Sequence, residues 1–278
     1  MGNILWIASY PKSGNTWMRA FISNYLKNAP QAVDINSINQ SLISEASAHR
    51  YAAHLHSDKQ TTDLSIEEIC AIRQRVHADI AREANGTTFV KTHNFLGKYK
   101  AYPLHNSAVT SGMIYIVRNP LDVTISMANY FNYSIDETIG YMANAMTGTP
   151  NERENVPQII TSWSLHVESW TQNPENHRLI LRYEDMLDEP KKAFRKVESF
   201  LGLKKDPKRL KKAVSFSSFS QLKSQENKRG FVEKHENAQT FFRQGQKNQW
   251  REHLTAEQIQ KIVELHAVQM ARFKYIPK

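Results

Sequence analysis

Short apolar runs alternate with amphipathic segments along this chain, and this alternation restricts the fold more than any other feature. The apolar runs that suit buried strands are residues 4–8, 87–92, 112–118 and 178–183. Helical patterns cover residues 16–27, 66–84 and 121–131, with Asp63 or Ser65 as a cap for the second and Pro120 in the first turn of the third. Strands that alternate with helices predict a parallel α/β sheet flanked by helices, whose ligands bind beyond the carboxyl ends of the strands.

Composition favours a single folded domain over residues 1–278. The chain is 40% hydrophobic and 23% charged, as in ordinary globular proteins, and it has no repeat or Gly/Ser linker. Its apolar runs are far shorter than the roughly 20 residues that cross a bilayer, and no signal-peptide pattern is present. The single cysteine, Cys70, cannot form an internal disulfide. We therefore expect a cytoplasmic protein that does not associate with membranes.

The net charge of +9 is concentrated in one segment, residues 191–212, which carries ten Lys or Arg and two acidic residues. Such a surface can attract nucleic acid or an acidic small molecule. It can equally be the solvated face of two helices, because Phe194, Val197, Phe200 and Leu201 fall at helical spacing. The solvated helix face is the favoured interpretation of residues 191–212.

Residues 30–86 are expected to be polar and mostly helical.

Residues 12–16, Lys-Ser-Gly-Asn-Thr, lie between the first strand and the first helix. Unpaired N–H groups at a helix N-terminus attract anions, and a lysine in the loop adds charge. The loop lacks the G-x-x-x-x-G-K-[ST] pattern of a Walker A motif. Local sequence alone leaves a phosphate site and an ordinary turn equally open.

Three other clusters are ambiguous when each is taken alone. Arg118 and Ser126 bracket the helix that starts at Pro120, where they can bind an anion or simply cap the helix. His93 follows a strand and can be a core histidine. Residues 241–250 place a basic side chain among aromatics, which also suits a surface loop.

Together, these segments resemble one family in order and spacing. Residues 10–17, Tyr-Pro-Lys-Ser-Gly-Asn-Thr-Trp, are similar to the YPKSGTTW loop of the cytosolic-type sulfotransferases, and residues 91–93 to their KTH segment. Residues 118–126 match the RNPxDVxxS pattern, and residues 242–245 followed by Trp250 resemble the RKG…W loop. The strings at 162–170 and 183–186 also fall where this family has similar ones. The chain is identified as a bacterial-like member, over about residues 4–255.

The resemblance implies a P-loop nucleoside-triphosphate-hydrolase-like sulfotransferase fold and transfer of a sulfonate group from 3′-phosphoadenosine 5′-phosphosulfate (PAPS), with release of 3′-phosphoadenosine 5′-phosphate (PAP). It implies catalytic roles for Lys12, Lys91, His93 and Ser126, with His93 as general base. It implies donor binding by Lys12, Ser13, Gly14, Asn15, Thr16, Trp17, Arg118, Ser126, Tyr183, Ser217, Phe219, Phe242, Arg243, Gln244 and Gly245. Within that set Trp17 and Phe219 correspond to adenine-stacking aromatics. No metal is required.

The acceptor is expected to be a small, partly apolar molecule with a hydroxyl or, less favoured, an amine. The basis is the group of aromatics Phe95, Tyr130 and Phe131 near the expected acceptor side. The chain departs from the family at Gln244, where Lys247 is a candidate replacement for the missing lysine, and in its dimer motif, which leaves the oligomeric state open. A basic nucleic-acid-binding protein and a nucleotide kinase on a related fold are the alternative functions, and neither has its own motif here.

Overall fold

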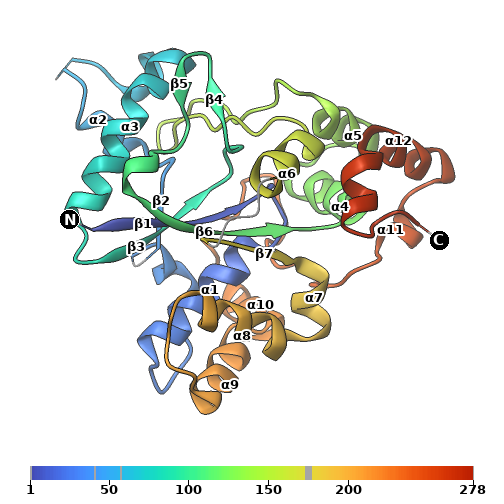
Figure 1. The fold of residues 1–278 in the computed structure, drawn as a ribbon. Helices are drawn as coiled ribbons and strands as arrows, with labels where there is room; N and C mark the ends of the chain where they lie inside the picture. The colour runs from blue at the N-terminus through green and yellow to red at the C-terminus, as the bar shows by residue number, and fades with distance from the viewer. Residues whose placement is uncertain (1, 41, 57, 173–176, 278) are drawn as a thin grey trace.

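The computed structural model describes residues 2–40, 42–56, 58–172 and 177–277, and its centre is a five-stranded parallel sheet with strand order β2-β3-β1-β6-β7 (Figure 1). The strands are β1 (Asn3–Ser9), β2 (Leu42–Ser44), β3 (Thr87–Thr92), β6 (Thr110–Val117) and β7 (Arg178–Arg182). A separate two-stranded antiparallel ladder joins β4 (Lys98–Tyr99) to β5 (Tyr102–Pro103). The parallel sheet and the four predicted strands are confirmed.

Each face of the sheet is covered by its own set of helices, because successive side chains of a strand point to opposite faces. Ile4, Trp6 and Ala8 of β1 belong to one apolar core and Leu5 and Ile7 to the other. The first core is completed by α3 (Ile66–Glu83), α4 (Pro120–Phe131), α5 (Ile135–Ala143), α6 (Trp163–Thr171) and α12 (Ala256–Arg272). The second is completed by α1 (Asn15–Lys27), α8 (Pro190–Phe200), α9 (Pro207–Phe216) and α10 (Phe219–Arg229). Figure 1 shows these two sets on opposite sides of the sheet.

The remaining helices are short: α2 (Ala48–Ala52), α7 (Tyr183–Asp188), α11 (Trp250–His253) and three 3₁₀ turns at Ile35–Gln40, Thr61–Asp63 and Ser107–Val109. The mostly helical prediction for residues 30–86 missed β2, which has three residues and is too short to show a period. Ser65 is the cap of α3, and its side chain accepts a hydrogen bond from the N–H of Glu68.

The basic segment 191–212 forms α8 and α9. Phe194 and Val197 are buried in the second core, while Lys191, Lys192 and Lys196 are exposed. The apolar residues therefore face inward, as their helical spacing predicts. Within the described residues, no helix combines the length and the apolar character that crossing a membrane requires.

Candidate active site

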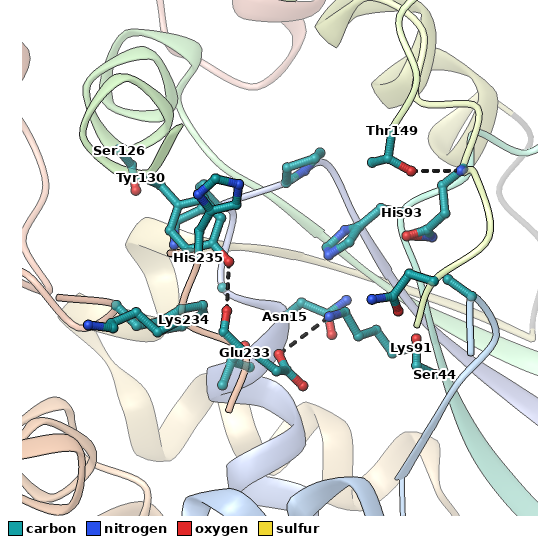
Figure 2. A pocket seen from close by; sticks show the side chains of 18 of the residues that line it. Asn15, Ser44, Lys91, His93, Ser126, Tyr130, Thr149, Glu233, Lys234 and His235 are labelled. Carbon is teal, nitrogen blue, oxygen red and sulfur yellow. Dashed lines mark hydrogen bonds and ion pairs between the residues drawn. The ribbon is translucent and has the colours of Figure 1, made fainter. Parts of the chain in front are cut away.

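A cavity of about 1170 Å³ brings together the three polar clusters that follow β1, β3 and β6. Its lining includes Lys12 after β1, Lys91 and His93 at the end of β3, and Arg118 and Ser126 after β6. Figure 2 shows Asn15, Lys91, His93, Ser126 and Tyr130 around one space. Parallel strands end at the same edge of a sheet, which is why Lys12 and Arg118, 106 residues apart in sequence, meet there.

The loop between β1 and α1 requires unusual backbone conformations. Lys12 and Gly14 both have positive φ angles, 62° and 105°. A Cβ on Gly14 would lie 2.7 Å from Cδ2 of Tyr183, so only glycine fits without movement. Helix α1 starts directly after Gly14, which provides no side-chain cap, and the first N–H groups of the helix therefore lack such a partner. These groups form an anion-binding edge at the cavity.

The side chain of Asn15 is held by the protein itself. Its Nδ2 donates to the carbonyl of Ile7 at 2.9 Å, and its Oδ1 accepts from Nε of Arg19 at 3.1 Å. Oγ1 of Thr16 accepts from the same guanidinium at 3.0 Å. Asn15 therefore ties α1 to β1, and its backbone N–H, rather than its amide, is available at the helix start.

The ammonium group of Lys12 lies between two aromatic rings. Nζ is 3.7 Å from the ring centroid of Tyr130 and 3.9 Å from that of Phe241. Burial, together with the positive charges of Arg118 and Lys91, lowers the pKa of Lys12 to about 7. An anion placed beside this group would stabilise its charged form.

His93 has a defined tautomer. Its Nδ1 lies 2.7 Å from the carbonyl oxygen of Ser9, which can only accept, so Nδ1 carries the proton. Nε2 then keeps its lone pair. Burial, and the charge of Lys91, lower the pKa of His93 to about 3, so the ring is neutral near neutral pH. A neutral imidazole with a free nitrogen beside a cavity can accept a proton from a ligand.

Arg118 connects the loop after β1 with the late loop of the chain. Its Nη1 donates to the carbonyl of Lys12 at 2.8 Å, and its guanidinium lies 4.4 Å from the ring centroid of Tyr183. Arg243, Gln244 and Gly245 also line the cavity. Gly245 has φ 63°, and a Cβ there would collide with the ring of Phe219, so the backbone of the loop packs directly against that ring.

Glu233 is a cavity residue that the sequence analysis missed. Its carboxylate accepts two hydrogen bonds from Arg19, at 2.8 and 2.6 Å, and lies 3.3 Å from Nζ of Lys91. Burial opposes the charge, but Arg19 and Lys91 hold the pKa of Glu233 well below its usual range. Figure 2 shows this carboxylate close to Lys91. The carboxylate of Glu233 thus partly neutralises the positive charge of Lys91.

Most predicted site residues line the cavity, and a few do not. The lining contains Lys12, Gly14, Asn15, Thr16, Trp17, Lys91, His93, Arg118, Ser126, Tyr130, Phe131, Tyr183, Phe219, Phe242, Arg243, Gln244 and Gly245. Ser13, Phe95 and Ser217 are not part of it. Oγ of Ser217 instead donates within α9 to the carbonyl of Ala213 at 2.8 Å. Lys247 forms an ion pair with Asp188 and is also outside the lining.

Three lining segments carried no recognisable motif. They lie within residues 39–50, 149–160 and 232–235. The first two are held against each other, since the N–H of Ala48 donates to Glu154 and that of Val156 to Ala46, at 2.9 and 2.8 Å. Apart from the short elements β2 and α2, the backbone of these two segments is irregular, so their sequence shows no period. In the described part of the chain, no group of three or more His, Cys, Asp or Glu side chains is placed to hold a metal ion.

Comparison with known proteins adds family relationships to this geometry. The sequence profile of the family described as "Sulfotransferase domain" matches residues 3–274. Sulfotransferase 1B1 of Canis lupus familiaris is 25% identical over 280 residues, covering 95% of this chain and 82% of the dog protein. Cytosolic sulfotransferase 1 of Arabidopsis thaliana is 25% identical over 271 residues, covering 92% of this chain and 75% of the plant protein.

Solved structures share the fold. Mouse sulfotransferase SULT7A1 complexed with PAP superposes with a TM-score of 0.63 at 20% identity, covering 96% of this chain and 84% of the mouse chain. Retinol dehydratase in complex with androsterone and the inactive cofactor PAP superposes with a TM-score of 0.65 at 17% identity, covering 96% of this chain and 80% of the other.

Proposed function

The chain belongs to the sulfotransferase domain family, and on this premise we propose that it transfers a sulfonate group from PAPS to a hydroxyl of a small, partly apolar acceptor and releases PAP. The observation that carries the proposal is the position of one neutral histidine, His93, in the same cavity as the cations Lys12 and Arg118. Lys12 and Arg118 provide positive charge for an anionic donor, and His93 provides a proton acceptor for the hydroxyl.

The residues of the cavity fit a donor with two phosphate groups. Nε of Arg118 and Nε1 of Trp17 are buried and find no hydrogen-bond partner among the described residues. Unsatisfied buried donors of this kind are costly unless a ligand meets them. The backbone N–H groups of residues 14–16 and Lys12 hold the 5′-phosphate, while Arg118, Ser126, Arg243 and Gly245 surround the 3′-phosphate; the N–H of Ser13 instead donates to the carbonyl of Tyr10 at 3.3 Å. Trp17 and Phe219 stack on the adenine, with Tyr183, Phe242 and Gln244 around it.

His93 acts as the general base. PAPS supplies the sulfonate group, and its sulfur receives the acceptor oxygen as the bond from sulfur to the phosphate oxygen breaks. Nε2 of His93 takes the hydroxyl proton during this step. Lys12 neutralises the charge that builds up on the leaving phosphate oxygen, and Lys91 adds positive potential from the end of β3. Positioning and charge stabilisation are the protein's contribution, as in phosphoryl transfer.

The acceptor side of the cavity suits a small organic molecule. Tyr130 and Phe131 line it together with the apolar side chains of Ile43, Val156 and Ile160. Apolar walls with few polar groups favour a small ligand over a polyanionic chain. The structures of retinol dehydratase bound to androsterone and to retinol support the same size class.

A labelled-PAPS screen of phenols, aliphatic alcohols, amines and glycosides tests the proposal. We expect transfer to a hydroxyl compound by the wild type and a turnover about 10²–10⁴-fold lower in His93→Ala, with PAP affinity nearly unchanged. Sulfonation of heparan-type chains or tyrosine peptides alone would disprove the acceptor class. Tight binding of ATP or an oligonucleotide, without PAP binding, would favour the kinase or nucleic-acid alternative.

A further inference from the structure

A buried carboxylate lies directly behind His93. Thr92 and Asn94, the residues on either side of the histidine, both direct their side chains to Oε1 of Glu45. Thr92 donates through its hydroxyl and Asn94 through Nδ2, and all three side chains are fully buried. Alternate residues of an extended segment point to opposite sides, so His93 is turned the other way, toward the cavity.

The second oxygen of Glu45 is held by α3. Nη1 of Arg73 and Nε2 of His77 each lie 3.2 Å from Oε2. The carboxylate loses its hydration on burial, yet the charge of Arg73 and the bond from His77 hold its pKa well below the usual range. Oε2 therefore binds the carboxylate to α3, and Oε1 accepts from the residues on either side of His93.

Helix α6 holds the main chain of the same segment. Nε2 of His166 donates to the carbonyl of His93 at 3.1 Å, and Nε1 of Trp170 donates to that of Asn94 at 3.0 Å. The N–H of Leu96 donates to Oγ of Ser169 at 3.0 Å. These are residues of the 162–170 string, which the proposed catalytic step does not use. Helix α6 thus holds the main chain and Glu45 holds the flanking side chains. Among the described residues, the ring of His93 itself is held by the bond from Nδ1–H to the carbonyl of Ser9.

We propose that Glu45 is a positioning residue that fixes His93 as its Nδ1–H tautomer and directs Nε2 into the cavity. It acts through Thr92 and Asn94 and does not touch a ligand, since it is not among the lining residues. The catalytic consequence rests on the proposed function, because it assumes that His93 is the base. The tautomer itself does not depend on that assumption. Displacing a catalytic group by about 1 Å can cost on the order of 10² in rate.

The test uses two variants of the 278-residue chain whose side-chain shape is nearly unchanged. Thr92→Val removes the hydroxyl that donates to Oε1 of Glu45 and accepts from the N–H of Asn94 at 3.0 Å, and Thr92→Ser retains it as the matched control. Glu45→Gln has one acceptor oxygen and one NH₂ group, so it cannot accept from Thr92 and Asn94 on one side and from Arg73 and His77 on the other. If Glu45→Gln fails to fold, the Thr92 pair carries the test.

The first measurement is NMR of ¹⁵N-histidine-labelled protein, with the His93 signals assigned by their loss in His93→Gln. We expect the Nδ1–H tautomer in the wild type and Thr92→Ser, and a mixture with the Nε2–H tautomer in Thr92→Val and Glu45→Gln. An unchanged pure Nδ1–H signal in folded variants would overturn the proposal. This readout needs no turnover, so it stands even if no acceptor is ever sulfonated.

The second measurement separates positioning from general damage. We expect Thr92→Val to lower kcat about 10- to 100-fold with KM for PAPS unchanged, and Thr92→Ser to restore it. In the His93→Gln background, Thr92→Val should cause no further loss. Equal losses in both backgrounds would show that the contact serves only the fold and would contradict the proposal.

Discussion

Lys12 holds its ammonium group between the rings of Tyr130 and Phe241 with a pKa lowered to about 7, so at pH 8 it is largely neutral in the free protein. A bound phosphate raises that pKa by direct attraction. We therefore expect PAP binding at pH 8 to take up close to one proton. Calorimetry in buffers of different ionisation enthalpy measures this uptake.

Lys12→Arg is the control for this proton, because arginine keeps its charge at every pH used. The variant should bind PAP with little or no uptake. If the binding enthalpy of the wild type did not depend on the buffer, Lys12 would already be charged in the free protein, and the interpretation of its surroundings would be wrong.

The cavity residues of the β1–α1 loop and those after β3 and β6 could be predicted from sequence, because each lies within a short motif of consecutive residues. Glu233 could not, since nothing near it in sequence indicates that Arg19 and Lys91 will enclose it. The same holds for Glu45, whose partners come from α3 and β3. A carboxylate can be expected to be buried only when its charged partners are known, and partners distant in sequence are seen only in the folded structure.

The segment between α10 and α11 has no regular secondary structure, and carboxylates hold its backbone in place. Glu226 accepts from the N–H groups of Phe241 and Phe242, at 2.6 and 2.9 Å. Asp122, at the start of α4, accepts from those of Asn248 and Trp250, at 2.8 and 3.2 Å. These bonds hold the stretch that carries Arg243 and Gly245 against the rest of the cavity.

Asp122→Asn replaces one of the two accepting oxygens by an NH₂ group and should loosen this segment. We expect PAP affinity to fall by about 1.5–3 kcal/mol, the scale of a hydrogen bond to a charged group. Hydrogen exchange of residues 243–250 should become faster. Asp136→Asn is the matched control, because Asp136 is exposed and, among the described residues, its side chain accepts from Gln258 at 3.2 Å. Equal exchange in both variants would contradict the role given to Asp122.

At the same scale, the predicted strands and long helices were found within a few residues of their expected ends, because periodicity and caps are local signals. The part of the cavity wall formed by residues 44–48 and 154–156 was not predicted. These two segments pair with each other across about 110 residues, with mostly irregular backbone and no repeated spacing. Such segments are positioned by tertiary hydrogen bonds, which a pattern search cannot detect.

Across the whole molecule, buried histidines make stability depend on pH. His77, His105, His166 and His266 are almost fully buried. Burial lowers the pKa of each, to about 3 for His105 and His166 and about 4 for His266. In the unfolded chain they titrate near 6.5, so below that pH the unfolded state binds more protons than the folded state.

The free energy of unfolding should therefore fall as pH drops from 6.5 toward 4, by up to about 1.4 kcal/mol per pH unit for each histidine. Urea unfolding at pH 7.5, 6.5, 5.5 and 4.5 measures this slope. His266→Gln removes one titrating group and should give a shallower slope. A free energy of unfolding that stayed constant between pH 6.5 and 4.5 would rule out neutral buried histidines.

The order of the strands has a consequence for synthesis. β1 leaves the ribosome before the other strands of its sheet, yet it lies in the middle of that sheet, where Asn3 pairs with Thr87 and Ile4 with Thr110. At roughly 5–20 residues per second, its apolar side chains wait on the order of 10 s for both neighbours to emerge. During that interval an unpaired apolar strand is exposed on every nascent chain. We therefore expect the yield of folded protein to rise when chaperones that bind exposed apolar segments are co-expressed.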